Sequence, residues 1–229
     1  MSKSHLKRLA APKEWPIKRK TAKFVIKPRG ALKSGMPLGF VLRDILGYAR
    51  TLREARNILR QKEVLVDEVK RKDVKYSVGI MDTLRFPELK TAFRMVLGKN
   101  KKLGLIKISG DEALTKVCKV KNKTIIKGRK IQLTMHDGSN IISDKSDYKT
   151  GDSLLVELPK HAIKNWIKLE KGALVYLTGG NHAGRVGKVE GVDSERVVVK
   201  LGEEVIETAK KFSMAIGTEK PLCTVEENG

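Results

Sequence analysis

The chain has 229 residues, with 48 Lys and Arg against 26 Asp and Glu, and therefore a formal net charge of +22. Aromatic residues make up only 5% of the composition, which argues against a single large core and favours several small modules. The sequence has no long apolar run, signal segment or amphipathic anchor, and Cys118 and Cys223 belong to no CxxC or Cys/His cluster, so we expect no membrane association, disulfide framework or zinc site.

The charge excess indicates a polyanion as the partner. A folded chain this basic repels itself unless its charge is neutralised, and nucleic acid is the leading candidate. A merely soluble basic protein, or one that touches anionic lipid, is the alternative. His5, His161 and His182 are scattered without the spacing of metal ligands, so we expect no metal and no cofactor.

Residues 1–37 have the composition of a basic arm. They contain eleven Lys and Arg residues and one acid, Glu14, while prolines and glycines interrupt any helix or strand. We expect little core here, disorder in the free protein and phosphate contacts when RNA is bound. Trp15 offers either a flat face for a base or an anchor on the protein itself, and a solubilising tail is the alternative for the whole arm. The candidate RNA contacts are His5, Lys7, Arg8, Lys13, Trp15, Lys18, Arg19 and Lys20.

A small helical module is predicted at the start of residues 38–100. The apolar residues from Leu38 to Leu46 recur with helical spacing, and Thr51 followed by Glu54 is a capping box that starts a second helix. One face of this second helix is apolar and the other is almost purely basic. We expect the basic face to contact phosphates, against the alternative of a solvated surface. Its residues are Arg53, Arg56, Asn57 and Arg60.

A short strand at residues 64–66 and a turn at Asp67-Glu68 follow. Two short helices and then "VLVDEVKRKDVKYSVGIMDTLRF" resemble the small RNA-binding module shared by bacterial ribosomal protein S4, tyrosyl-tRNA synthetases and many pseudouridine synthases. The resemblance runs from residue 38 to about residue 90, with Asp67-Glu68 where that family usually has Asn-Gly. It implies RNA contacts from the second helix and from the turn after the first strand. With the adjacent basic cluster, these positions are Arg53, Arg56, Arg60, Lys62, Lys70, Arg71 and Lys72.

The rest of the chain is mainly strand by pattern, with a central β domain at residues 101–170 and a barrel with a C-terminal tail at 171–229. A hairpin is predicted over residues 131–142, around the tight-turn pair Asp137-Gly138. Short strands at such intervals favour small barrels or sandwiches over a doubly wound sheet, so the fold class is α+β, mainly β. Alternation in a later segment predicts one face with Ile163, Ile167 and Leu169 and another with Lys164, Trp166 and Lys168.

The glycine-rich stretch "TGGNHAGRVG" at residues 178–187 has the outline of a nucleotide-binding P-loop. Gly184 is followed by Arg185 and Val186, however, where a P-loop needs Lys and then Ser or Thr, and "VGKVEGV" favours a strand over a helix. A glycine-rich turn between strands lets the backbone approach RNA, and a turn that needs glycine only for positive φ is the equal alternative. The candidate residues are Gly179, Gly180, Asn181, His182, Gly184 and Arg185.

Two further resemblances combine with the helical module. "KGALVYLTGGNHAGRVGKVEGV" at residues 171–192 resembles the KOW motif, which forms part of a small SH3-like barrel in ribosomal and transcription-elongation proteins. "HLKRLAAPKEW", the helical module, "LTMHDGSN" and the KOW segment follow in the order of the S4e family of archaeal and eukaryotic small-subunit ribosomal proteins. The chain stops soon after "TVEENG", which favours an archaeal-type member.

The S4e resemblance implies a non-catalytic, cytoplasmic, ribosome-bound protein that is monomeric within the ribosome and lies on small-subunit rRNA beside neighbouring small-subunit ribosomal proteins. One alternative is an RNA-modifying enzyme of the pseudouridine synthase class, with Asp44 as its superficial catalytic candidate. A KOW-type transcription elongation factor is the other. His136, Asp137 and Ser139 lie in a predicted turn, where neighbouring side chains diverge and cannot form a catalytic triad, so we expect no catalytic residues.

Overall fold

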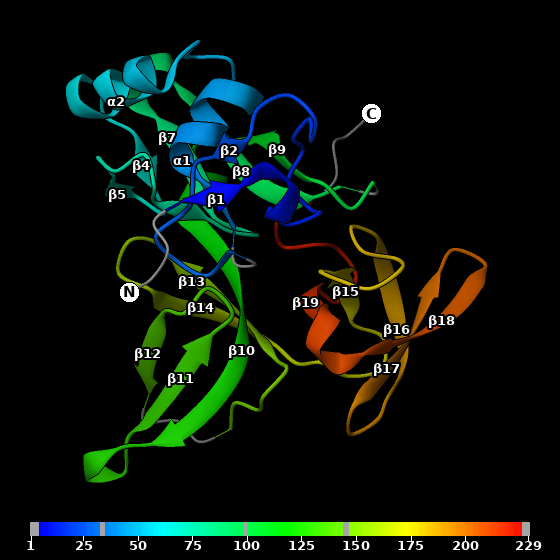
Figure 1. Cartoon of the computed structure of the whole chain (residues 1–229). Coiled ribbons are helices and arrows are strands. Elements are labelled where there is room, and N and C mark those ends of the chain that lie inside the picture. The colour runs from blue at the N-terminus through cyan, green and yellow to red at the C-terminus, as the bar shows by residue number, and fades with distance from the viewer. Residues whose placement is uncertain (1–4, 33–34, 99, 144–146, 226–229) are drawn as a thin grey trace. The chain divides into compact units, whose positions relative to one another are not determined.

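The computed structural model describes residues 5–32, 35–98, 100–143 and 147–225, and it confirms a mainly β chain with a small helical part (Figure 1). The chain divides into two compact units, Met1–Leu97 with Lys102–Ala113, and Gly98–Lys101 with Leu114–Gly229. Within the described residues, no helix has the length and apolar character that crossing a membrane requires.

The main sheet of the first unit is antiparallel, in the order β5-β4-β7-β8-β9. Its strands are β4 (Leu65–Val66), β5 (Val69–Lys70), β7 (Thr83–Phe86), β8 (Thr91–Leu97) and β9 (Leu103–Ile108). β9 pairs with β8 along its whole length, from Leu97 opposite Leu103 to Ala92 opposite Ile108. The sheet therefore continues past residue 100, the predicted end of the module. A second small pairing joins β3 (Met36–Pro37) to β6 (Ser77–Val78).

Two helical segments accompany this sheet, in the expected order. The first begins as α1 (Leu38–Phe40) and continues as the wider π-helical turn η3 (Val41–Ile45), in which the Leu46 N–H donates to the Val41 carbonyl at 3.0 Å. Gly47 ends it at a φ of 68°, a conformation that glycine adopts without strain. The second is α2 (Leu52–Gln61), which starts at the predicted capping box.

The described part of the basic arm, residues 5–32 and 35–37, is folded, which contradicts the expected disorder. β1 (Leu6–Lys7) pairs with β2 (Phe24–Val25), with the short 3-10 turn η1 (Arg8–Ala10) after β1. Trp15 is only 1% exposed, and its ring lies 6.2 Å from that of Phe40 on the helical module. The expectation was wrong because it counted the residues that break regular structure and missed a large aromatic side chain whose burial fastens the arm.

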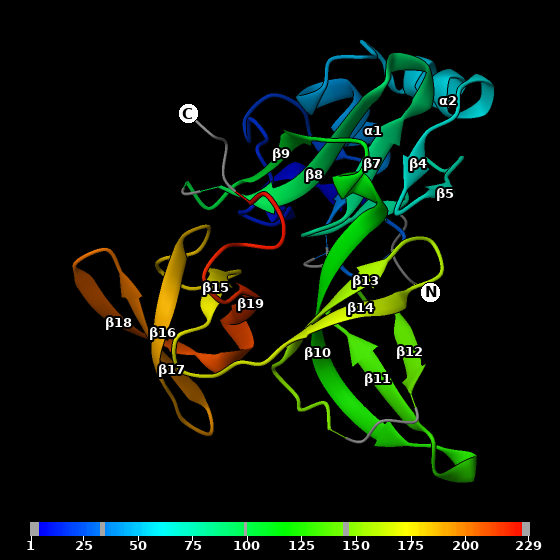
Figure 2. The same ribbon diagram turned by 180° about the vertical axis from the view of Figure 1, so that it is seen from behind.

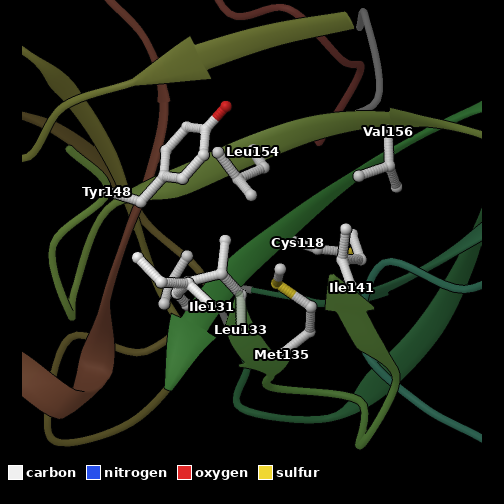
Figure 3. Close-up of a cluster of buried hydrophobic side chains, with 9 residues drawn as sticks. Cys118, Ile131, Leu133, Met135, Ile141, Tyr148, Leu154 and Val156 are labelled. Carbon is white, nitrogen blue, oxygen red and sulfur yellow. The ribbon is translucent and has the colours of Figure 1, made fainter. Parts of the chain in front are cut away.

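The central sheet of the second unit has the order β12-β11-β10-β13-β14 (Figures 1 and 2). Its strands are β10 (Thr115–Ile125), β11 (Ile131–Met135), β12 (Asn140–Ser143), β13 (Ser153–Glu157) and β14 (Ala162–Ile167). β11 and β12 form the predicted hairpin, with Gly138 at a φ of 89°. Figure 3 shows the core enclosed by this sheet, where side chains from β10, β11, β12 and β13 meet Tyr148.

The predicted faces of residues 163–169 are partly wrong. Ile163 and Trp166 both pack against the central core, although they lie three residues apart. The cause is a register shift in the pairing of β13 with β14 between Leu155 and Val156, which reverses the alternation along β14. The Trp166 indole N–H donates to the Asp152 carboxylate at 2.9 Å, so the inward-turned ring has a hydrogen-bond partner for its one polar group.

The C-terminal sheet of the second unit has the order β18-β17-β16-β15-β19. Its strands are β15 (Leu174–Leu177), β16 (Val186–Val192), β17 (Arg196–Leu201), β18 (Glu204–Ala209) and β19 (Ser213–Gly217). Val197 and Val199 of β17 both point inward and are fully buried. Short 3-10 turns complete the described elements, namely η4 (Pro87–Leu89), η5 (Glu112–Leu114), η6 (Lys127–Arg129) and η7 (Lys210–Phe212).

Candidate nucleic-acid interface

Helix α2 is held by its N-terminal cap and its apolar stripe. The Thr51 hydroxyl accepts from the Glu54 N–H at 3.2 Å, and the Glu54 carboxylate accepts from the Arg50 N–H at 2.7 Å. The backbone hydrogen bond from Arg50, followed by the Thr51 hydroxyl, lowers the pKa of Glu54. Ala55 and Leu59 are completely buried on the inner side. The cap therefore fixes where the helix starts, and the stripe fixes which side faces solvent.

The outer side of α2 carries the four residues that the sequence predicted, and all four are exposed. We call Arg53, Arg56, Asn57 and Arg60 the helix face. Within the described part of the chain, no acidic side chain forms an ion pair with its three arginines. Lys62 differs, because its ammonium group lies 2.7 Å from the Glu88 carboxylate. The helix face thus offers three uncommitted charges, whereas Lys62 already has a partner.

A pocket of about 400 Å³ lies beside the β4–β5 hairpin. We call it the basic pocket, and it is lined by Arg29, Lys70, Arg71, Lys72, Asp73 and Tyr76. The Arg71 guanidinium lies 4.3 Å from the centre of the Tyr76 ring, and its Nε is buried without a hydrogen-bond partner among the described residues. Four cationic side chains against one carboxylate suit a phosphate group.

Arg29 is the functional candidate that sequence reasoning missed. Its N–H donates to the Lys75 carbonyl at 2.9 Å, and its Nε lies 3.2 Å from the Asp73 carboxylate. The arm folds back at this point and adds a guanidinium to a cluster more than forty residues later in the chain. Only its membership of a basic arm could have drawn attention to it, because its neighbours in space are distant in sequence.

Several predicted contacts of the arm serve the arm itself. Arg8 donates to the carbonyls of Lys18 and Ala22, and Arg19 donates to those of Leu9, Ala11 and Pro12. These bonds satisfy main-chain acceptors that have no strand partner. Trp15 is buried, which favours the predicted anchor on the protein over the predicted flat face for a base. The exposed candidates that remain are His5, Lys7, Lys13, Lys18 and Lys20.

The glycine-rich loop connects β15 to β16, and a strand follows it as predicted, so it lacks the helix of a P-loop. Gly180 and Gly184 have φ values of 84° and 85°. Gly184 is buried and its N–H donates to the Leu177 carbonyl at 2.7 Å, so its backbone is not exposed for the predicted contact with RNA. A Cβ on Gly179 would lie 2.4 Å from the Phe212 ring.

The glycines of this loop are therefore required by the fold, which favours the turn alternative for them. Asn181 and Arg185 are exposed and His182 is half-buried. These three side chains, with the exposed backbone of Gly180, are what the loop can present to a partner.

The sequence neighbours His136, Asp137 and Ser139 form no catalytic series. The Asp137 carboxylate accepts directly from the Ser139 hydroxyl at 2.7 Å and from the Lys116 ammonium at 2.8 Å, while His136 Nδ1 accepts from the Lys119 N–H. Asp137, His136 and Cys118 offer ligand atoms within 4.8 Å of one another. A metal ion there would face the buried ammonium of Lys116, which repels it.

Four family models match segments of the chain. They are the RS4NT domain at residues 2–30, the S4 domain at 37–84, ribosomal family S4e at 89–163 and the KOW motif at 171–201. The helix face and residues 70–72 of the basic pocket lie within the S4 match, and the glycine-rich loop lies within the KOW match.

Relatives match over nearly the whole chain. Small ribosomal subunit protein eS4 of Methanococcus aeolicus is 38% identical, over 97% of this chain and 98% of its own length. Its counterpart in Methanocella arvoryzae is 40% identical, over 96% and 97%. The crystal structure of the 30S ribosomal protein S4e from Thermoplasma acidophilum has a TM-score of 0.72 at 31% identity and covers 85% of this chain and 99% of its own.

Proposed function

The chain belongs to the ribosomal S4e family, and we propose that it is a structural constituent of the small ribosomal subunit that binds and stabilises folded rRNA. The observation that carries this proposal is the similarity to small ribosomal subunit proteins eS4 over 96% or more of the chain. The family is one of ribosomal proteins, and its members are not enzymes. The net charge of +22 supports the same proposal, because rRNA supplies the polyanion that neutralises it.

Phosphate neutralisation is the proposed mode of binding. Lys and Arg side chains displace the counterions of the RNA, and this release supplies affinity without any bond-making chemistry. The helix face supplies three arginines without acidic partners among the described residues, and the basic pocket supplies a concave site that suits one phosphate group. The exposed lysines of the arm and the polar tip of the glycine-rich loop add contacts. These are Lys7, Lys13, Lys18, Lys20, Asn181, His182 and Arg185.

Neither alternative function is favoured. A pseudouridine synthase shares the S4 domain, and Asp44 is the superficial catalytic candidate here. The Asp44 carboxylate, however, forms an ion pair with the neighbouring Arg43 guanidinium at 2.7 Å. The relatives that match over nearly the whole chain are named as ribosomal proteins. The KOW motif alone therefore gives no support for a transcription elongation factor. The proposed place of action is the ribosome in the cytoplasm, next to other small-subunit proteins.

The test measures affinity for purified small-subunit rRNA as a function of salt. The logarithm of the association constant should fall against the logarithm of salt concentration with a slope of about 0.7 to 0.9 per neutralised phosphate, and we expect about 8 to 12 phosphates. A nearly flat dependence would contradict the proposal. Arg56→Glu/Arg60→Glu should weaken binding and incorporation into small subunits while the fold is retained, because both side chains face solvent.

The matched control for this double variant is Lys107→Glu/Lys200→Glu, which makes the same change in net charge at exposed residues of β9 and β17. If both variants lose affinity equally, the helix face acts only through the overall charge of the protein. If the helix-face variant is incorporated normally, the face is a solvated surface.

A further inference from the structure

The hairpin formed by the end of β10 and the start of β11 is the most basic strand pair of the second unit. Residues 120–135 contain five Lys and Arg residues and no Asp or Glu. The two strands pair from Val120 opposite Met135 to Ile125 opposite Ile131. In Figures 1 and 2 the turn that joins them stands at the far end of this sheet, beyond β12. A strand pair of this composition is held together by its backbone ladder and not by ion pairs.

The side chains at this end of β10 are not used by the core. Residues 121–125 are all exposed, although an ordinary strand at the edge of a core would bury every second one. Ile125 is 73% exposed, while Ile131 directly opposite is 6% exposed. Within the described part of the chain, Lys121, Arg129 and Lys130 have no acidic partner. Packing in the core therefore explains the apolar side chains of β11, but it does not explain the exposed side chains in the outer half of β10.

The turn of this hairpin combines an unusual backbone conformation with exposed basic side chains. Gly128 and Arg129 have φ values of 80° and 58°, and this left-handed pair folds the chain back within the 3-10 turn η6. Arg129 and Lys130 are exposed at the turn, and Lys121 is exposed on the strand that leads to it. Two strands lie about 4.8 Å apart, so a hairpin is narrow enough to follow the surface of an RNA helix.

We propose that residues 121–132 of this hairpin form a further RNA-binding element, which gives the central β domain its part in the protein's function. Lys121, Arg129 and Lys130 contact phosphates, and Ile125 lies against a sugar or an unstacked base. Charge complementarity identifies the partner, since a segment with five basic residues and no acidic ones fits a polyanion. This inference rests on the proposed function, because it takes rRNA as the ligand of the whole chain.

The first test compares two triple variants with the same change in net charge. Lys121→Glu/Arg129→Glu/Lys130→Glu changes the hairpin, and Lys107→Glu/Lys171→Glu/Lys200→Glu changes exposed bases elsewhere. Circular dichroism and thermal unfolding establish that each variant folds. The hairpin variant should bind small-subunit rRNA about tenfold or more weakly than the control variant, and its salt slope should be lower by about 2 to 3, one step for each lost phosphate contact.

Failure of this inference is distinct from failure of the proposed function. If the unmodified chain does not bind small-subunit rRNA, the proposed function fails. If the unmodified chain binds, the helix-face variant binds weakly and the hairpin variant equals its control, only the role of the hairpin is overturned.

The second test identifies what lies against the hairpin in the assembled particle. Ile125 is replaced by a benzoylphenylalanine photo-crosslinker in the full chain, and small subunits that contain it are purified and irradiated. Because Ile125 is 73% exposed, the replacement leaves the core intact. A crosslink to rRNA supports the proposal and locates the contact by sequencing. A crosslink to a neighbouring protein, or no crosslink to rRNA, overturns it.

Discussion

The ammonium group of Lys116 lies 2.8 Å from a carboxylate oxygen of Asp137, and the Lys116 side chain is completely buried. Burial alone would raise the pKa of Asp137, but the charge and the hydrogen bond of Lys116, with the Ser139 hydroxyl, hold it well below its ordinary value. The pair joins β10 to the turn between β11 and β12. A buried pair of this kind is costly to break from one side.

Asp137→Asn should lower the free energy of unfolding of the second unit by about 3 kcal/mol or more at neutral pH, because it leaves a buried ammonium group without its carboxylate. The folded pKa of Asp137 lies below its unfolded value. The pair therefore contributes its full stability above the ordinary carboxyl pKa of about 4 and loses it as the pH falls below that value. The Asn variant should lose less stability than the unmodified chain over this acidic range.

The measurement is urea unfolding at neutral and acidic pH, followed by the fluorine signal of incorporated 5-fluorotryptophan. The two tryptophans, Trp15 and Trp166, report separately on the first and the second unit. Asp193→Asn, an exposed carboxylate in the same unit, is the control. Equal stabilities of Asp137→Asn and Asp193→Asn would show that the pair contributes nothing.

Lys119 should make the second unit more stable in alkali. Its ammonium group is buried and donates to the carbonyls of Lys210 and Ser213 at 2.6 and 2.5 Å. Burial, and then repulsion by Lys210, lowers the pKa of Lys119 from 10.5 to about 8. Between these two values the unfolded chain binds more protons, so the free energy of unfolding rises with pH, by at most about 3 kcal/mol.

Lys119→Met should remove this alkaline rise, as seen by urea unfolding at pH values from 8 to 10.5. Lys121→Met is the matched control, since it removes an exposed ammonium group two residues later on the same strand. The prediction is contradicted if the free energies of unfolding of the two variants change with pH in the same way.

Local patterns predicted those elements whose causes are local. Thr51 and Glu54 are three residues apart, and the Thr51 hydroxyl accepts a hydrogen bond from the Glu54 N–H. The start of α2 can therefore be predicted from four consecutive residues. The Asp137-Gly138 turn is equally local. Other features depend on contacts that no short window contains. The burial of Trp15 depends on Phe40, and the basic pocket exists because Arg29 reaches Asp73.

Trp166 shows that the sequence pattern also fails to predict an irregular strand pairing. Strict alternation placed it away from the core, but the register shift between β13 and β14 turned it inward. A bulge of one residue leaves no mark in the hydrophobic pattern of its own strand, because the partner strand determines where the pairing slips.

Removal of the Trp15 anchor should release the basic arm. Trp15→Ala deletes an almost completely buried side chain and should cost the first unit about 3 to 5 kcal/mol. Limited trypsin digestion followed by mass spectrometry should then show faster cleavage at Lys18, Arg19 and Lys20, because the arm is no longer held on the module. Lys13→Ala, an exposed change in the same arm, removes one trypsin site but should leave the rate of cleavage at Lys18, Arg19 and Lys20 unchanged. Identical rates at these three residues in the two variants would mean that Trp15 does not fasten the arm.

Gly179 separates the two explanations of the glycine-rich loop. A Cβ there would lie 2.4 Å from the Phe212 ring, whereas a Cβ on Gly191 of β16 would meet nothing within 4 Å. Gly179→Ala should therefore destabilise the second unit by about 1 to 3 kcal/mol, and Gly191→Ala should leave it nearly unchanged. Urea unfolding followed by the Trp166 fluorine signal measures both.

The double variant Gly179→Ala/Phe212→Leu removes the ring atoms that the new methyl group would strike, so it should regain most of the lost stability. Its affinity for small-subunit rRNA then decides between the explanations. Recovery of binding together with stability means that the loop needs glycine for its own packing. A stable double variant that still binds weakly means that RNA approaches the backbone at Gly179, because a methyl group at that position would hold the phosphate chain away.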